Sequence, residues 1–510
     1  MHEHRLPSSP RFWRSPLRGT WFTSVLGVVL LAGITVLFVT GLLSYAAYNP
    51  DLSRVNDKTP DKGLLGFYLF DWPTDPVWLY RFTQGVHVTL GVVLVPVLLA
   101  KLWSVVPKLF AMPPARSLAH GLERLSLLLL VGGALFQFVT GLLNIQLDYI
   151  FPGSFYRLHF YGAWVFFAAF ALHAALRTPT ALRTLRAHRH GAAPPPPPPA
   201  GPEGPPEGTP EAAGPAPGGA PEAAAGEPGG GGGKPEGTTG EPGDGKPEGT
   251  TGEPGDGKPE GTTEEPGDGK PEGEDGGPPA DPDPADLAAP RPDAPTVSRR
   301  GALWFVGGGS LLLFATTVGR SFDGPLRTTA LLAPHGWTDP GSGPGGFQIN
   351  KTAASRGIRP AETTEDAWRL TVTGPAGTVR LSRAGLLELP LHSAALPIAC
   401  VEGWSTSAQW WRGVRLRDLA ELAGYRPEDP PDVLVESLQR RGSFRIAALR
   451  ANQVADGRSL LALDVNGEPL TPDHGFPARV IVPNAPGVLN TKWVTRLDFG
   501  DLSGSDGGRS

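Results

Sequence analysis

Residues 397–405 read Pro-Ile-Ala-Cys-Val-Glu-Gly-Trp-Ser, and they contain the single cysteine of a chain of 510 residues. One thiol excludes a disulfide framework within the chain, so Cys400 is either a buried core residue or a residue kept for chemistry. A thiolate is a soft ligand that a high-valent transition metal such as molybdenum can use. On this chemistry alone a core position is the more common outcome, and the surrounding sequence has to decide.

Further motifs lie before and after the cysteine loop, and together they resemble the sulfite oxidase superfamily. They are Phe347-Gln-Ile-Asn350-Lys351, Asn466-Gly-Glu-Pro-Leu470, Asp473-His474-Gly-Phe-Pro-Ala-Arg479 and Lys492-Trp493. The string Cys-Val-Glu-Gly-Trp-Ser is most similar to the branch that contains periplasmic protein-methionine-sulfoxide reductases.

The resemblance covers roughly residues 345–500 and implies an α+β domain that binds a molybdenum–molybdopterin cofactor. It implies that Cys400 is the protein ligand of the molybdenum. The implied pterin contacts are Asn350, His474, Arg479 and Lys492. Arginine and lysine suit this role physically, since one offers a bidentate fork and the other a point charge to a phosphate.

Two departures from that family concern the substrate and the assembly. Sulfite oxidases of the family place a tyrosine before the Lys-Trp pair, and residues 483–491 contain none. They also carry a C-terminal dimerisation domain, whereas this chain ends about 17 residues after Trp493. Both departures argue against sulfite oxidation, and they favour a monomeric catalytic domain. Arg412 and Arg415 are predicted to anchor an anionic or polar substrate.

Apolar runs predict membrane-spanning helices. Most approach the length of about 20 residues that crosses about 30 Å of hydrocarbon. Basic residues flank the N-terminus, the second loop and the tail after the fourth run, so these parts are expected in the cytoplasm. A fifth run then carries the chain outward, and everything after Arg320 is expected outside. The predicted cores are Trp21–Tyr45, Trp78–Leu102, Leu125–Ile145, Phe160–Leu176 and Ala302–Val318.

The predicted fold is multi-domain. Residues 1–190 form an all-α four-helix transmembrane bundle, and residues 191–297 form a Pro/Gly/Glu-rich linker that is expected to be disordered. Residues 298–320 form the fifth helix, and residues 321–510 form the α+β molybdopterin domain. Predicted elements of that domain are strands at Trp368–Thr373, Arg479–Val482 and Trp493–Phe499, and a helix at Leu416–Ala423.

The start of the fifth helix, Ser298-Arg299-Arg300, resembles a twin-arginine export signal. That route would carry a domain across the membrane after its cofactor has been inserted in the cytoplasm. The alternative is that two arginines simply anchor an ordinary helix.

Four histidines of the helical part are predicted haem ligands, because ionisable residues in a membrane helix are functional candidates and neutral imidazole ligates b-type haem. His159 and His173 are 14 residues apart, close to four helical turns, so they share one helix face. The arrangement resembles diheme cytochrome b subunits of membrane formate dehydrogenases and hydrogenases. That resemblance implies an outer haem on His87 and His159, and an inner haem on His173, for which His120 is the best second ligand.

The string Phe-Val-Thr-Gly-Leu-Leu occurs at 38–43 and again at 138–143. Either two helix pairs form an internal repeat, or the small residues only help helices to pack closely.

These observations predict a membrane-bound molybdenum oxidoreductase. It would perform oxygen-atom or two-electron transfer on a small extracytoplasmic substrate or an oxidised protein, and one or two b-type haems would exchange electrons with membrane quinone or quinol. Nucleic acid is not an expected partner, since the positive charge flanks apolar segments. One alternative is an electron-transfer cytochrome that carries a non-catalytic molybdopterin-fold domain. Another is a quinol-linked ferric reductase. The direction of electron flow is left open by the sequence.

Overall fold

The computed structural model of the chain describes residues 20–52, 70–109, 118–145, 155–189, 297–322, 325–332, 343–442 and 444–502. The predicted linker lies outside these ranges except for Val297, and so does the basic N-terminal flank. The part before residue 192 and the part after residue 281 belong to one compact unit.

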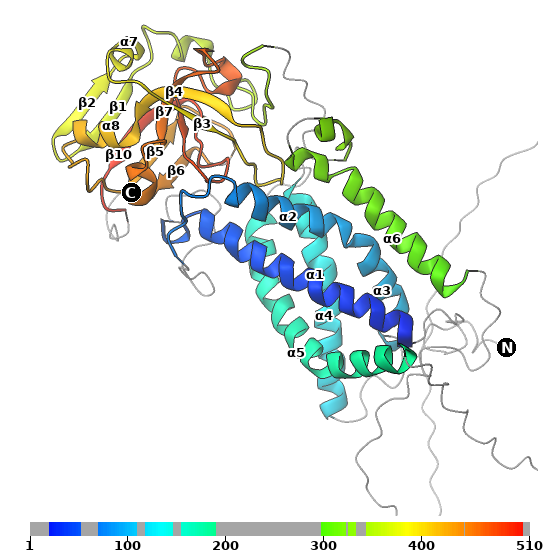
Figure 1. Cartoon of the computed structure of the whole chain (residues 1–510). Helices are drawn as coiled ribbons and strands as arrows, with labels where there is room; N and C mark the ends of the chain where they lie inside the picture. The colour runs from blue at the N-terminus through cyan, green and yellow to red at the C-terminus, as the bar shows by residue number, and fades with distance from the viewer. Residues whose placement is uncertain are drawn as a thin grey trace, which may run out of the picture. The chain divides into compact units, whose positions relative to one another are not determined.

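The helical part consists of long apolar helices (Figure 1). Four of them are long and apolar enough to cross a membrane, and a fifth crossing follows if the bent pair α2–α3 is one span. The bend of that pair is 41° and falls inside the predicted run Trp78–Leu102. Pro96 accounts for it, because proline has no N–H to continue the helical ladder. The bounds are α1 Thr20–Ala47, α2 Leu79–Val93, α3 Val95–Leu109, α4 Leu118–Asn144, α5 Phe155–Arg189 and α6 Arg299–Ala315.

The interior of the bundle changes character along α1. From Phe22 to Ile34 the helix packs into an apolar core that also includes Leu94, Phe166 and Phe170. From Ile34 to Tyr45 it lines a cavity. The bundle is therefore filled at one end and hollow at the other.

The C-terminal domain contains two sheets of five strands each (Figure 1). The first has the order β2-β1-β10-β5-β6, in which β1 and β10 run parallel. The second has the order β3-β4-β7-β8, and β9 also pairs with β7. The strands are β1 Leu370–Gly374, β2 Gly377–Leu381, β3 His392–Leu396, β4 Gln409–Arg415, β5 Val433–Ser437, β6 Ile446–Leu449, β7 Leu460–Val465, β8 Glu468–Pro469, β9 Arg479–Ile481 and β10 Val494–Phe499.

Short helices connect the strands, and the main core lies between the two sheets. The helices are α7 Arg383–Leu387, α8 Leu416–Leu422 and α9 Ala451–Ala455, with a 3-10 helix, η8, at Pro472–His474. The core includes Val372, Val435, Leu461, Val480 and Leu497, all fully buried. This confirms the predicted α+β class, and the three predicted strands and the predicted helix all occur as β1, β9, β10 and α8.

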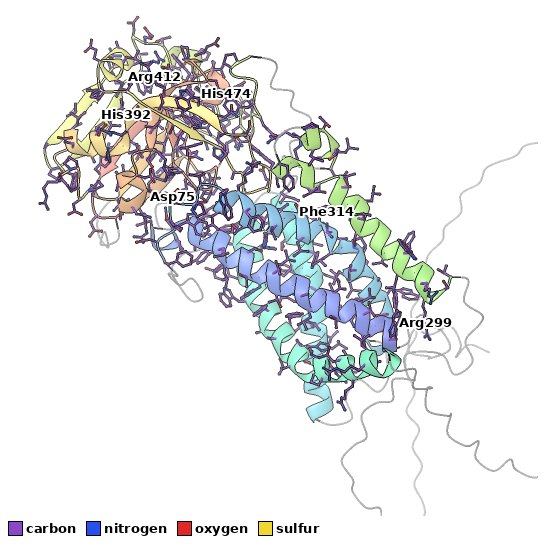
Figure 2. The ribbon with its side chains drawn as sticks, viewed as in Figure 1. Asp75, Arg299, Phe314, His392, Arg412 and His474 are labelled. Carbon is purple, nitrogen blue, oxygen red and sulfur yellow. The ribbon has the colours of Figure 1, made fainter. Side chains whose placement is uncertain are left out.

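The segment before α2 is fastened to the C-terminal domain. The Trp72 indole N–H donates to the Asn484 carbonyl over 2.7 Å, and Asn484 Nδ2 donates back to Pro73. Arg458 forms an ion pair at 2.8 Å with Asp75, which is labelled in Figure 2. These contacts, together with a hydrogen bond of 2.9 Å from Asn49 to Gln453, hold the domain against the ends of α1 and α2.

Candidate functional site

The loop between β3 and β4 carries Cys400 in a closed turn. The Cys400 N–H donates to the Trp404 carbonyl over 2.8 Å, and the Gly403 N–H donates back to the Cys400 carbonyl over 3.1 Å. Gly403 has φ +84°, a conformation that favours glycine because other residues place Cβ against the backbone. The turn brings the thiol within 3.0 Å of a Glu402 carboxylate oxygen, and the Trp404 indole N–H donates to the same oxygen over 2.7 Å.

The Cys400 thiol is buried, with 3% of the residue exposed. Burial raises its pKa well above the usual value, and the Glu402 carboxylate raises that pKa further. A buried sulfur in this setting keeps its proton unless a cation replaces it. A metal ion that displaces the proton would meet this requirement, since only the thiolate is a metal ligand.

A cluster of cations lies beside the cysteine loop. Lys492 Nζ donates to the carbonyls of Lys351 (2.9 Å) and Asp473 (2.7 Å). The Arg479 guanidinium donates to the His474 carbonyl over 3.3 Å and lies 5.4 Å from the centre of the Trp411 ring. Its buried Nε–H has no hydrogen-bond partner among the residues that the structure describes.

The electrostatics of this cluster favour an anionic ligand. Burial lowers the pKa of Lys351 to about 8, and the neighbouring Arg356 contributes. Burial also lowers the pKa of Arg479 to about 9, and burial together with Arg479 lowers the pKa of Lys492. Buried charges of one sign are costly unless a counter-charge is bound. The donors and their charge therefore fit a phosphate-bearing cofactor.

His474 is held by Thr471 and by the Phe347 carbonyl. It ends η8, its Nδ1 lies 2.7 Å from the Thr471 hydroxyl, and its Nε2 lies 3.3 Å from the Phe347 carbonyl. Burial, followed by the charges of Arg479 and Lys492, lowers the pKa of His474 to about 4. The imidazole is thus neutral at ordinary pH and adds a polar contact without adding to the charge.

A cavity of about 360 Å³ connects this site with the hollow end of the bundle. On the domain side its lining includes Asn350, Lys351, Arg356, Cys400 and Glu402. The predicted residues Asn350 and Cys400 are thus brought together, whereas His474, Arg479 and Lys492 lie behind Lys351 in the same cationic cluster.

Three residues of this site were not among the predicted site residues. Glu402 belongs to the cysteine motif and Lys351 to the motif at 347–351, but neither residue was given a role. Arg356 follows Lys351 by five positions in an irregular segment, and no pattern in the sequence distinguishes it from a surface arginine. Only the fold places its charge next to Lys351 and Lys492.

The two arginines predicted as substrate anchors have other partners. Arg412 lies on β4 with 52% of its side chain exposed and pairs with Asp464 at 3.3 Å (Figure 2). Arg415 pairs with Asp418 at 2.7 Å. Neither lines the cavity that contains Cys400. For Arg412, alternation along β4 explains this, because residues 410 and 412 point to the face opposite the buried Trp411.

The hollow end of the bundle contains a pair of histidines. The ring centres of His87 on α2 and His159 on α5 are 6.3 Å apart, and their planes are perpendicular. His87 Nδ1 lies 3.0 Å from the Thr40 hydroxyl, and His159 Nδ1 lies 2.9 Å from the Thr140 hydroxyl. The Nε2 atoms are left for another ligand, because each Nδ1 already has a polar contact.

The repeated string has the same role in both helix pairs. A Cβ on Gly41 would lie 3.2 Å from the His87 ring, and a Cβ on Gly141 would lie 3.3 Å from the His159 ring. Each Thr-Gly pair therefore positions one histidine. The threonine hydroxyl contacts Nδ1, and the absence of a side chain on the glycine leaves room for the imidazole ring. This supports the interpretation of the string as an internal repeat of two helix pairs.

The other two predicted haem ligands lie elsewhere. His173 is half-buried on α5, beyond Phe166 and Phe170 of the packed core. His120 belongs to the first turn of α4, and its side chain is outside the described part of the chain. A haem on these two residues stays a prediction.

Comparison with known proteins shows which families the C-terminal domain resembles. Residues 357–505 match the family model of the oxidoreductase molybdopterin binding domain. The chain is 33% identical over 164 residues to mitochondrial sulfite oxidase of Drosophila melanogaster, a match that covers 28% of each protein. It is 34% identical over 133 residues to the uncharacterized oxidoreductase YuiH of Bacillus subtilis, covering 26% of this chain and 65% of that one.

A nitrate reductase of Oryza sativa is 40% identical over 103 residues, which is 19% of this chain and 11% of that protein. The chain thus spans less than two thirds of the length of these relatives, and the match to the family model covers the domain that carries Cys400. Residues 357–505 are therefore similar to the molybdopterin-binding domain of oxidoreductases, and the relatives that match the chain include a sulfite oxidase and a nitrate reductase.

Proposed function

We propose that this chain transfers an oxygen atom, or two electrons, to or from a small substrate at a molybdenum that Cys400 ligates. The observation that carries the proposal is one cavity lined by the buried thiol, a carboxylate and the edge of a buried cationic cluster. A molybdenum–pterin cofactor supplies the redox chemistry when it is bound, and the protein supplies ligation, orientation and charge.

The residues around the cavity have separate tasks in this proposal. Cys400 holds the metal, while Lys351, Arg356, Arg479 and Lys492 neutralise the pterin phosphate. Glu402 has a different task. Its carboxylate lines the cavity and accepts from the Cys400 thiol and from the Trp404 indole N–H. That position suits proton exchange with a substrate oxygen in the same cavity.

The histidine pair supports a b-type haem at the hollow end of the bundle. The two imidazoles would hold the haem iron, since their rings lie 6.3 Å apart and each Nδ1 already has a polar contact with a threonine hydroxyl. We propose a single haem on His87 and His159, because apolar side chains fill the bundle from Phe22 to Ile34 of α1, where a second haem would need space.

The exposed surfaces of the helices support insertion in a membrane. Trp304 and Phe305 of α6 are 80% and 86% exposed, and Leu99, Leu128 and Val165 of other helices are also exposed. A continuous apolar surface of this kind is stable in hydrocarbon rather than in water. In this topology His87 and His159 would hold the haem at the extracytoplasmic end of the bundle, where it could exchange electrons with membrane quinone or quinol. The catalytic domain then lies outside the cytoplasm, as a monomer.

Metal analysis and optical spectroscopy of the purified full chain test the proposal. We expect close to one molybdenum and one b-type haem per chain. We also expect the reduced-minus-oxidised haem spectrum to respond to one of the candidate substrates sulfite, methionine sulfoxide, nitrate or chlorate. Protein that lacks molybdenum while retaining haem would support the alternative, a cytochrome with a non-catalytic binding domain.

A further inference from the structure

The cysteine loop is bonded to the helical part as well as to its own domain. The Gln84 side-chain amide, on α2, donates to the Val401 carbonyl. The Ser321 hydroxyl, just after α6, donates to the Gly403 carbonyl over 2.9 Å, and the Ser405 N–H donates to the Arg320 carbonyl over 3.2 Å. Two carbonyls and one N–H of the loop next to Cys400 therefore depend on residues outside the sheet domain.

The residues at this junction are closely packed. A Cβ on Gly403 would lie 2.7 Å from Val88 of α2, and a Cβ on Gly85 would lie 2.9 Å from the Ser321 hydroxyl. Arg81 of the same helix donates to the Ser321 carbonyl over 2.8 Å. The loop thus lies between one face of α2 and the 3-10 helix η5, Val318–Ser321.

The same turn of α2 carries a histidine of the bundle. Gln84 and Val88 contact the cysteine loop, and His87 lies three residues after Gln84, one helical turn away. Gln84 is 6% exposed, so its hydrogen bond is shielded from water. A short run of one helix therefore joins the backbone beside Cys400 to one of the two imidazoles.

The matching position in the other helix pair makes a different contact. Tyr156 precedes His159 by three residues, as Gln84 precedes His87. Its ring stacks on Tyr48 at 5.4 Å, and Tyr48 lies 6.3 Å from Phe444 of the C-terminal domain. The polar link to the cysteine loop therefore belongs to α2, and the aromatic link belongs to α5.

We propose that Gln84 is a positioning residue that fixes the molybdenum-ligating loop on the haem-ligating helix, so that the helical part completes the molybdenum site. The proposal rests on the proposed function, because it presupposes a metal at Cys400 and a haem at His87. Its consequence is that the sheet domain alone does not set the geometry of the Cys400 ligand.

The test compares Gln84→Met with Ser310→Ala in the full chain. Methionine keeps the length of glutamine but cannot donate to the Val401 carbonyl. Ser310→Ala is the matched control, because the Ser310 hydroxyl also donates from one element to a carbonyl of α2, that of Val93, at 2.8 Å and away from the loop. Each variant is examined for molybdenum content, haem spectrum, the Mo(V) electron paramagnetic resonance signal and the rate of electron equilibration after a photoreduced flavin delivers one electron to the haem.

We expect Gln84→Met to retain both metals and the haem spectrum, to change the Mo(V) signal, and to slow equilibration by on the order of 10- to 100-fold, the usual effect of losing an outer-sphere partner. Ser310→Ala should match the wild type in every measurement.

If Gln84→Met does not fold, Ser321→Ala removes the neighbouring hydrogen bond to the Gly403 carbonyl and should change the Mo(V) signal in the same direction. A Gln84 variant with a wild-type Mo(V) signal and rate would overturn the positioning role alone. Wild-type protein without molybdenum would overturn the proposed function, and the positioning role with it.

Discussion

The two ends of the shared cavity differ in nearly every chemical property. On the domain side the lining includes Lys351 and Arg356, with Arg479 and Lys492 behind them. On the bundle side the helices α1, α2, α4 and α5 contribute no lysine, arginine, aspartate or glutamate to the described lining, only two histidines among apolar and neutral groups. Charge alone can therefore sort an anionic pterin to one end and an apolar macrocycle to the other.

The largest expected effect is on the cysteine. Cys400→Ser should abolish turnover, because a hydroxyl is a poor replacement for a soft thiolate ligand, while the haem spectrum stays unchanged. Substrate turnover and a reduced-minus-oxidised spectrum on the same preparation measure both. Arg412→Ala is the control, and it should leave turnover intact because Arg412 lies on the exposed face of β4. Full activity of the serine variant would contradict the ligand assignment.

A substitution at the bundle end of the cavity should affect the haem and not the molybdenum. His159→Ala should remove the b-type haem, since one of its two protein ligands is lost, while the molybdenum content remains that of the wild type. Optical spectra and metal analysis distinguish the two losses. A single-haem bundle also requires that His173→Ala retains the haem spectrum. Loss of half of the haem in that variant would show that the filled end of the bundle binds a second haem.

Two buried arginines test whether charge at the domain end of the cavity retains the cofactor. Arg479→Met removes a charged donor from the cationic cluster, and cofactor retention should weaken by roughly 10- to 150-fold, from about 1.5–3 kcal/mol. Arg383→Met removes an equally buried arginine that already pairs with Asp464 at 3.2 Å. That variant should lower thermal stability without weakening cofactor retention. Equal cofactor loss in both variants would show that burial, not charge toward the pterin, explains the effect.

The smallest expected effect is a pH dependence of the cofactor-free protein. The folded pKa of Lys351, about 8, lies below its ordinary value of 10.5, so the unfolded chain binds the extra proton between these values. Stability should therefore rise as pH increases from about 8 to 10.5, and this rise should be smaller in Lys351→Met, in which only Lys492 still contributes a lowered lysine pKa. Thermal unfolding in detergent across that range measures the difference. Identical pH profiles for the two proteins would mean that Lys351 is not constrained by the cluster.

Much of the fold follows from local patterns. The apolar runs, the three predicted strands and the helix at 416–423 occur where periodicity and length predicted them, since burial of one face or of a whole helix leaves a signal in neighbouring residues. The break at Pro96 was missed because the apolar run continues on both sides of it. Arg412 and Arg415 were predicted as anchors for an anionic or polar substrate. Arg412 lies on the exposed face of β4, and Arg415 pairs with Asp418 at the end of that strand.

The sequence by itself determined the kind of chemistry: one cysteine in a distinctive loop, separated basic residues, and histidines in apolar helices. Those are properties of residue types and spacing. Only the tertiary structure decided which of them meet, because contacts such as Thr140 with His159, Arg356 with Lys351 and Gln84 with the Val401 carbonyl join segments whose separation carries no periodic signal. The junction between a membrane helix and the cysteine loop is such a contact, and it exists only when both parts are folded together.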